Sequence, residues 1–181
     1  MSGVAYIVEP SGLAALQSVV GATSSGPGAI TKTAADGWGN CGAASVRSVA
    51  AGDCAAYLPA GSCASPFLVG LDRDASCTGY GGIDFALVYN GTVALIYQAG
   101  SLVLNAGAMN PATDLIRVAV ESGVVNYRKS GALLYASLVA PTFPLYAVCA
   151  LQNQGSSLTG FRIFEAAEVL SGAPAGSVAR I

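Results

Sequence analysis

From residue 83 onward, apolar and polar side chains alternate along short segments separated by turn residues. This period of two is typical of β-strands. In one segment, for example, Ile116, Val118 and Val120 fall on one face and Arg117 and Glu121 on the other. We therefore expect one face of each strand to be buried and the other to be solvated. The pattern predicts strands over residues 83–89, 92–98, 101–104, 114–121, 124–129, 132–138, 145–151 and 161–167.

The connections between these segments carry hairpin signals. Asn90-Gly91 separates the first two segments, and this dipeptide tolerates the positive φ angles that a tight primed turn requires. Ser122-Gly123 and Ser130-Gly131 separate three later segments in the same way. They predict a three-stranded meander, in which we expect Tyr127 and Tyr135 to be cross-strand partners.

The first eighty residues are less regular. Residues 4–8, 30–33, 46–49 and 67–71 have the composition of strands, while residues 11–20 predict either a short helix capped by Ser11 or a strand rich in Ala and Leu. About a dozen short strands without a long helical pattern indicate an all-β, two-sheet antiparallel β-sandwich. We expect one domain over residues 1–170, with an N-terminal arm of about 20 residues, and a C-terminal tail over residues 171–181.

Several of these segments resemble a known module. Asp84-Phe85-Ala86-Leu87 and the run from Ile116 to Tyr135 are similar to a repeating module of bacterial surface and secreted proteins, and Lys32-Thr33 and Gly37-Trp38 look like its first strands. The module belongs to the concanavalin A-like lectin and glucanase jelly-roll group. The resemblance implies a two-sheet sandwich, often with a concave surface that faces a sugar, but this fold hosts many functions. The stretch from Cys41 to Cys77 departs from the module.

Charged residues are scarce, at 10% of the chain compared with 53% hydrophobic residues. Residues 85–113 and 130–161 contain no charge at all. In an evolved protein, a surface of small apolar groups more often marks contacts between subunits. The first hypothesis is therefore a structural subunit that self-assembles with its own copies into an extracellular, cell-surface or virion-surface fibre, shell or layer, with the tail contacting a neighbour. The alternative is a carbohydrate-binding, lectin-like module.

Other classes of function fit the sequence poorly. The net charge is −2 and the basic residues are scattered along the chain, which argues against nucleic acid. Glycine and proline interrupt both uncharged stretches, so neither predicts a membrane span. Residues 1–20 lack the positively charged start of a signal peptide. The chain has no histidine and no strand motif of paired carboxylates, so we expect no enzymatic activity.

Three tyrosines are candidate sugar-binding residues, because exposed aromatic rings stack on the apolar faces of pyranose rings. These are Tyr80, Tyr97 and Tyr146, of which only Tyr80, in a glycine-rich run, is expected to be exposed. Trp38, between two glycines, is interpreted as a core or corner residue.

Carboxylates and cysteines give two further hypotheses. Asp72, Asp74 and Asp84 are candidate Ca²⁺ ligands, and the alternative is that they are turn and strand-start residues partly neutralised by Arg73. No other cofactor is expected. Four cysteines cluster in the first half of the chain and lack the close spacing of a zinc site, so they predict two disulfides with three possible pairings. The alternative is that they are free buried thiols. The four are Cys41, Cys54, Cys63 and Cys77, while Cys149 is interpreted as a small buried hydrophobe.

Overall fold

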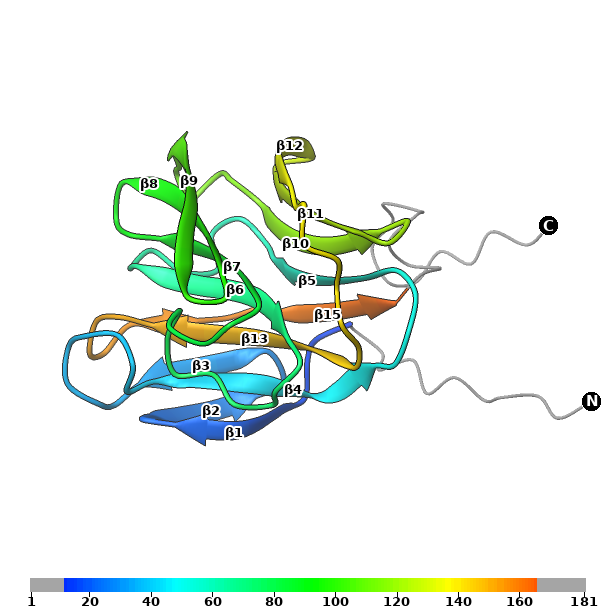
Figure 1. Ribbon diagram of the computed structural model, residues 1–181. Coiled ribbons are helices and arrows are strands. Elements are labelled where there is room, and N and C mark those ends of the chain that lie inside the picture. Colours follow the sequence, from blue (N-terminus) through cyan, green and yellow to red (C-terminus); the bar gives the residue numbers. More distant parts are fainter. Residues whose placement is uncertain (1–11, 166–181) are drawn as a thin grey trace, which may run out of the picture.

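A computed structural model describes residues 12–165, which fold as antiparallel sheets packed in layers (Figure 1). Within these residues there is no helix, and hence none that is long and apolar enough to cross a membrane. The seven-stranded sheet has the order β1 (Leu16–Val20), β4 (Gly42–Val49), β13 (Leu145–Leu151), β6 (Phe67–Asp72), β7 (Phe85–Tyr89), β8 (Val93–Gln98) and β9 (Ser101–Ala108). The five-stranded sheet has the order β12 (Ala132–Ala136), β11 (Val124–Lys129), β10 (Ile116–Glu121), β5 (Cys54–Leu58) and β15 (Arg162–Glu165). A small third sheet has the order β14 (Ser157–Leu158), β3 (Ala29–Lys32) and β2 (Ala22–Gly26). The predicted all-β sandwich is confirmed.

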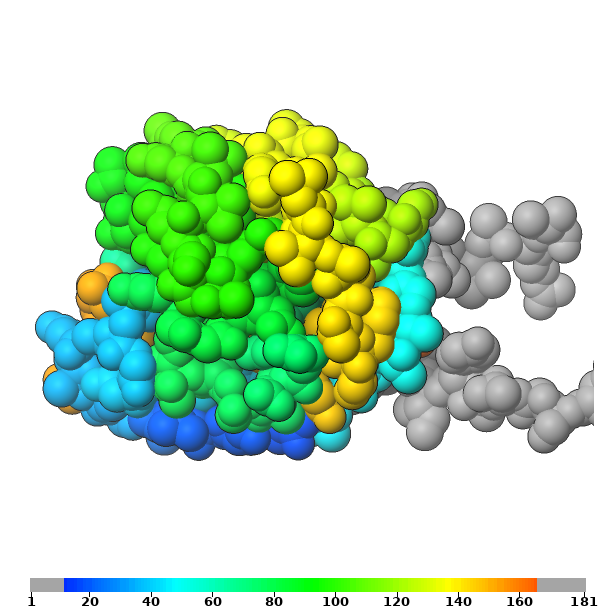
Figure 2. All heavy atoms as spheres, in the orientation of Figure 1, coloured from blue at the N-terminus to red at the C-terminus, as the bar shows by residue number. Residues whose placement is uncertain are grey.

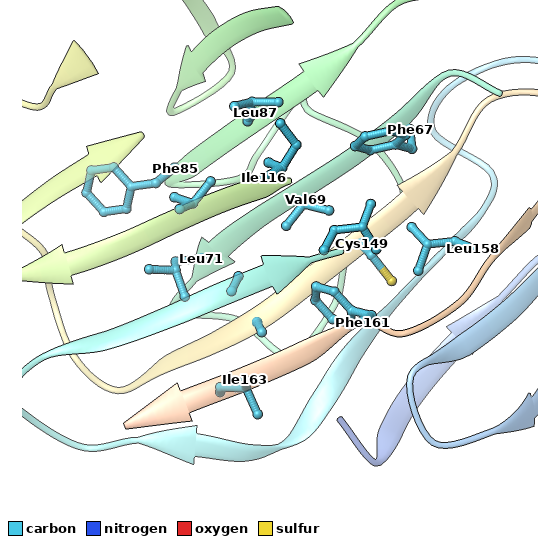
Figure 3. Close-up of a cluster of buried hydrophobic side chains, with 14 of the residues drawn as sticks. Phe67, Val69, Leu71, Phe85, Leu87, Ile116, Cys149, Leu158, Phe161 and Ile163 are labelled. Atoms are coloured by element: carbon cyan, nitrogen blue, oxygen red, sulfur yellow. The ribbon is translucent and has the colours of Figure 1, made fainter. Parts of the chain in front are cut away.

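The main core lies between the two larger sheets. Alternate side chains of β6, such as Val69 and Leu71, pack there with Leu87 of β7 and with Ile116 from β10 (Figure 3). A strand directs successive side chains to opposite faces. The other residues of β6 and β7 therefore point to the opposite face of the seven-stranded sheet, which we call the outer face. A second buried cluster covers it, made of Ala44, Leu68, Cys77, Ile83, Ala86, Val88, Val148 and Ala150.

The predicted hairpins form, but at Asn90-Gly91 only Gly91 has a positive φ, of 103°, whereas the prediction placed it at both residues. Asn90 Oδ1 accepts hydrogen bonds from the backbone N–H groups of Thr92 and Val93, both at 3.0 Å. The two turns of the meander have positive φ at both central residues, 51° and 81° at Ser122-Gly123 and 48° and 86° at Ser130-Gly131. This is the geometry of primed turns, which match the right-handed twist of paired strands. Tyr127 and Tyr135 are cross-strand partners as predicted, with ring centroids 6.0 Å apart.

The first part of the chain differs more from expectation. Residues 16–20 form strand β1, so the helix considered there is absent, and strands β2 and β5 were not predicted. β5 is central, since it pairs with both β10 and β15. The strand predicted over residues 4–8, most of the N-terminal arm and the C-terminal tail lie outside the described residues.

The predicted disulfides are corrected by the structure, in which all five cysteines are free and buried. Cys41, Cys54, Cys63 and Cys149 pack into the core between the sheets, whereas Cys77 packs into the outer-face cluster. The thiols therefore serve as small apolar side chains that fill the interior. Burial raises the pKa of the Cys54 and Cys63 thiols to about 11, which disfavours the reactive thiolate.

Candidate functional site

Three aromatic side chains meet on the outer face of the seven-stranded sheet. Tyr97 extends from β8 opposite Ala86, a member of the outer-face cluster. Tyr80 lies in the loop over residues 73–84, and its ring centroid is 4.5 Å from that of Tyr97 and 5.7 Å from that of Trp38. All three side chains are half-buried. We call Trp38, Tyr80 and Tyr97 the aromatic row.

Trp38 is positioned by a lysine that is itself almost wholly buried. Lys32 is 1% exposed, and its Nζ donates hydrogen bonds to Gly37 O at 2.6 Å, to Asn40 Oδ1 at 2.7 Å and to Leu151 O at 3.1 Å. Two of these acceptors flank Trp38 in sequence and the third belongs to β13. Because a buried ammonium group requires hydrogen-bond partners, Lys32 fixes the loop around Trp38 to the sheet.

The loop that carries Tyr80 lies directly on the sheet. A Cβ atom placed on Gly42 would be only 2.0 Å from the carbonyl oxygen of Cys77, so glycine is required at this contact. Gly39 N donates a hydrogen bond to Thr78 O at 2.8 Å, which joins this loop to the one that carries Trp38. Gly100, at the β8–β9 turn, is in similarly close contact with Gly81. Glycines therefore allow the loops at this end of the sheet to approach one another.

Two members of the aromatic row border a shallow hollow of about 400 Å³. Its lining is Trp38, Gly39, Thr78, Gly79, Tyr80, Gly81 and Gly82. This lining combines two aromatic rings with glycine backbone and the hydroxyls of Thr78 and Tyr80, and it contains no carboxylate or amine. Such a surface offers apolar contact and neutral hydrogen-bonding groups.

Two of the three predicted metal ligands, Asp72 and Asp84, contact other groups through their carboxylates. Arg73 Nε lies 2.7 Å from Asp84 Oδ2, and Asp72 Oδ1 accepts a hydrogen bond from the backbone N–H of Asp74 at 3.4 Å. Within residues 12–165, no group of three or more carboxylate or thiol side chains is arranged to hold a metal ion. Burial, together with the negative charges of Asp84 and Asp74, raises the pKa of Asp72 to about 6.

The structure brings together two of the three predicted tyrosines. Tyr80 and Tyr97 are in contact, while Tyr146 packs against the same buried cluster from β13, where it lies opposite Asp72. Among the described residues, no ring contact joins Tyr146 to the aromatic row. Trp38, interpreted from the sequence as a core or corner residue, packs against the outer-face cluster and also borders the hollow. The glycines on either side of it were the available signal, since small neighbours leave a large ring accessible.

Solved structures resemble this architecture at low sequence identity. A TRIM65 PSpry domain matches with a TM-score of 0.59 and 13% identity, covering 81% of this chain and 90% of that one. The Emp47p carbohydrate recognition domain matches with a TM-score of 0.52 and 10% identity, covering 83% of this chain and 88% of that one. The carbohydrate binding module CBM66 from Bacillus subtilis matches with a TM-score of 0.50 and 10% identity, covering 83% of this chain and 93% of that one.

No protein-family model matches the sequence, and no curated protein matches it either. Alginate lyases are also similar in structure, but their TM-scores of 0.48 and below carry no argument about catalysis. Identities this low show the fold alone. They confirm the resemblance that the sequence motifs indicated: the described chain has the concanavalin A-like jelly-roll fold.

Proposed function

We propose that this chain is a non-catalytic carbohydrate-binding module that acts outside the cell and binds a neutral glycan at the aromatic row. The observation that supports this proposal is the uncharged hollow bordered by Trp38 and Tyr80. Sugar rings present apolar C–H faces and hydroxyl edges at the same time. The aromatic rings can stack on the C–H faces, while the glycine backbone and Thr78 offer hydrogen-bonding groups to the hydroxyl edges.

The experiment begins with a glycan array, followed by titration of the best ligand. Trp38 is the only tryptophan in the chain, so its fluorescence reports directly on the hollow. We expect Tyr80→Ala and Trp38→Ala each to weaken binding roughly tenfold or more, as loss of a stacking ring does at binding hot spots. Trp38→Ala is followed by calorimetry, because it removes the fluorophore.

Tyr135→Ala is the matched control. Tyr135 also contacts another ring, with its centroid 6.0 Å from that of Tyr127, but it lies on the five-stranded sheet. The proposal fails if no glycan binds, or if the Tyr135 and Tyr80 variants lose affinity equally. A chelator included in the titration tests the calcium hypothesis. The hypothesis would be supported if the chelator abolished binding by the wild type, if added Ca²⁺ restored it, and if Asp72→Asn showed no such recovery.

A second candidate function is self-association, supported by exposed aliphatic side chains on two neighbouring segments. Four of the most exposed aliphatic side chains come from two short segments: Leu102 and Val103 on β9, and Leu138 and Val139 after β12, with Leu138 at 95% exposure. Val103 and Val139 line one hollow of about 360 Å³. Figure 2 shows the segment of β9 in green beside the yellow segment that follows β12.

Sheet extension between copies is the less favourable route to such association. Three of the four outer strands of the two larger sheets, β1, β9 and β12, have register shifts in their pairing. Bulged edges disfavour addition of a further strand, so contact through side chains is the better proposal. We expect sedimentation velocity to show concentration-dependent association that Leu138→Asp abolishes and Val46→Asp, at another exposed valine, leaves intact. A chain that stays monomeric at high concentration would exclude this candidate.

A further inference from the structure

Three arginines lie in one row across the five-stranded sheet. Arg162 of β15 is directly opposite Tyr57 of β5, Tyr57 is opposite Arg117 of β10, and Arg117 is opposite Arg128 of β11. Residues directly opposite each other in an antiparallel ladder point to the same face. The neighbouring residues Ile116, Val118 and Ile163 point into the core, so the row lies on the face directed away from it. We call Arg162, Tyr57, Arg117 and Arg128 the arginine row.

The row is ordered by contacts among its own members. The guanidinium carbon of Arg162 lies 6.0 Å from the centroid of the Tyr57 ring, within the range of a cation–π interaction. Phe164 meets the same ring edge to face at an interplanar angle of 88°. Among the described residues, no carboxylate forms an ion pair with Arg162. Its guanidinium is therefore held in place by the ring and not by an acid.

Within residues 12–165, the three arginines of this face outnumber its two carboxylates, those of Glu121 and Asp53. Arg117 Nη2 lies 2.6 Å from Glu121 Oε1, and Arg128 Nη2 lies 2.7 Å from Glu121 Oε2, so two guanidinium groups share one carboxylate. Although partial burial acts to raise the pKa of Glu121, hydrogen bonds from Arg128 and the charge of Arg117 lower it overall. Asp53 lies at the end of the face, where its carboxylate accepts the N–H of Ser122 at 2.8 Å.

The row is also long enough for an extended ligand. Adjacent strands are about 4.8 Å apart, so the four strands from β15 to β11 spread the arginines over about 14 Å. Guanidinium groups bind carboxylate and sulfate oxygens through paired N–H donors. Nucleic acids are a poorer match, because specific affinity for them rests on more phosphate contacts than three arginines provide.

We propose that the arginine row is a second ligand site, which binds a segment of an anionic polysaccharide through Arg162 and Arg117. The carboxylate or sulfate groups of successive sugars accept hydrogen bonds from the two guanidinium groups on either side of Tyr57. This site lies on the five-stranded sheet, whereas the aromatic row lies on the outer face of the seven-stranded sheet. It is therefore independent of the neutral-glycan site.

The test is calorimetric titration with alginate oligosaccharides, which carry carboxylates, and with heparin oligosaccharides, which carry sulfates, over a series of salt concentrations. We expect binding at low salt to at least one of them. Arg162→Gln and Arg117→Gln should each weaken this binding roughly tenfold. Each should also reduce the slope of log Kd against log salt concentration by about 1, as the loss of one ionic contact does. Lys129→Gln is the matched control, because it removes the same charge from a residue whose Nζ bonds Ala108 O, away from the row.

A gain of affinity provides the sharper test. Glu121→Gln removes the carboxylate that occupies Arg117 and Arg128, so we expect binding to strengthen several-fold, with urea unfolding confirming that the variant is folded. The proposal is overturned if neither oligosaccharide binds, if Glu121→Gln weakens binding in a folded protein, or if Lys129→Gln has the same effect as Arg162→Gln. Tighter binding of a single-stranded DNA oligomer than of either polysaccharide would overturn the assigned class of ligand. If Arg162→Gln still binds the neutral glycan, a negative result at the arginine row is separate from a failure of binding at the aromatic row.

Discussion

Lys32→Met should destabilise the fold and disturb the aromatic row in a single change. Methionine keeps much of the length of lysine but cannot donate hydrogen bonds, so the carbonyl oxygens of Gly37 and Leu151 and the side-chain oxygen of Asn40 would lose their donor. Each buried acceptor left without a partner costs about 1–3 kcal/mol, while removal of a buried charge offsets part of that sum. We therefore expect the free energy of unfolding to fall by about 3–5 kcal/mol.

Urea unfolding followed by circular dichroism measures this loss, and Trp38 emission measures the state of the loop. We expect a red shift in native emission, because the loop that holds Trp38 in its half-buried position would lose two hydrogen bonds to Lys32. Lys129→Met is the control: Lys129 donates to Ala108 O at an exposed contact, so its loss should cost less than about 1 kcal/mol. If Lys32→Met unfolds within 1 kcal/mol of wild type with unchanged Trp38 emission, the reasoning about this buried lysine is refuted.

Three further changes test the packing around the site. The pKa of Asp72, about 6 in the fold, lies above its value in the unfolded chain, so the contribution of Asp72 to the free energy of unfolding should fall by about 1–3 kcal/mol as pH rises from 4 to 7. Glu121, whose pKa is lowered, acts in the opposite direction, so the contribution of Asp72 is measured as the difference between urea titrations of wild type and Asp72→Asn, and an equal pH dependence in both proteins would contradict the assignment. Buried thiols of raised pKa should resist a thiol reagent at pH 8 in the native protein and react fully in denaturant, and rapid native labelling of Cys54 or Cys63 would count against their burial. Gly42→Ala should cost about 1–3 kcal/mol, since the new methyl group overlaps Cys77 O, and an unchanged urea midpoint would show that the loop is not seated on the sheet.

The sequence predicted best the strands whose two faces differ in polarity. In β10, Ile116, Val118 and Val120 are buried while Arg117 and Glu121 are partly exposed, and this contrast is visible as alternation in the sequence. β5 was missed because it carries no such contrast. Ala55 is as fully buried on one face as Ala56 is on the other, so the strand lacks a polar side. A central strand made of small residues gives no periodic signal, although it joins β10 to β15.

The candidate sites were less predictable because they depend on contacts between distant segments. Tyr80 and Tyr97 could be chosen individually as aromatic residues near turns, but their contact with Trp38 requires the loop that Lys32 holds in place. The basic residues appeared scattered in the sequence, yet strand register aligns Arg162 with Arg117 through Tyr57. Sequence spacing does not determine which strands become neighbours. Such rows emerge only once the order of strands in the sheet is known.

Contacts between distant segments also determine how much of the outer face is covered. The loop over residues 73–84 inserts Cys77 and Ile83 into the buried cluster, so the chain itself covers the middle of that face. Gly42 and Ala44 on β4 make room for it, since a larger side chain at the first position would collide with Cys77 O. A ligand that cannot displace this loop is restricted to the end of the sheet, where Trp38 and the glycines beside Tyr80 leave the hollow open. The cysteine-rich stretch that departs from the resembling module therefore covers this face, which is why we propose ligand binding at its rim.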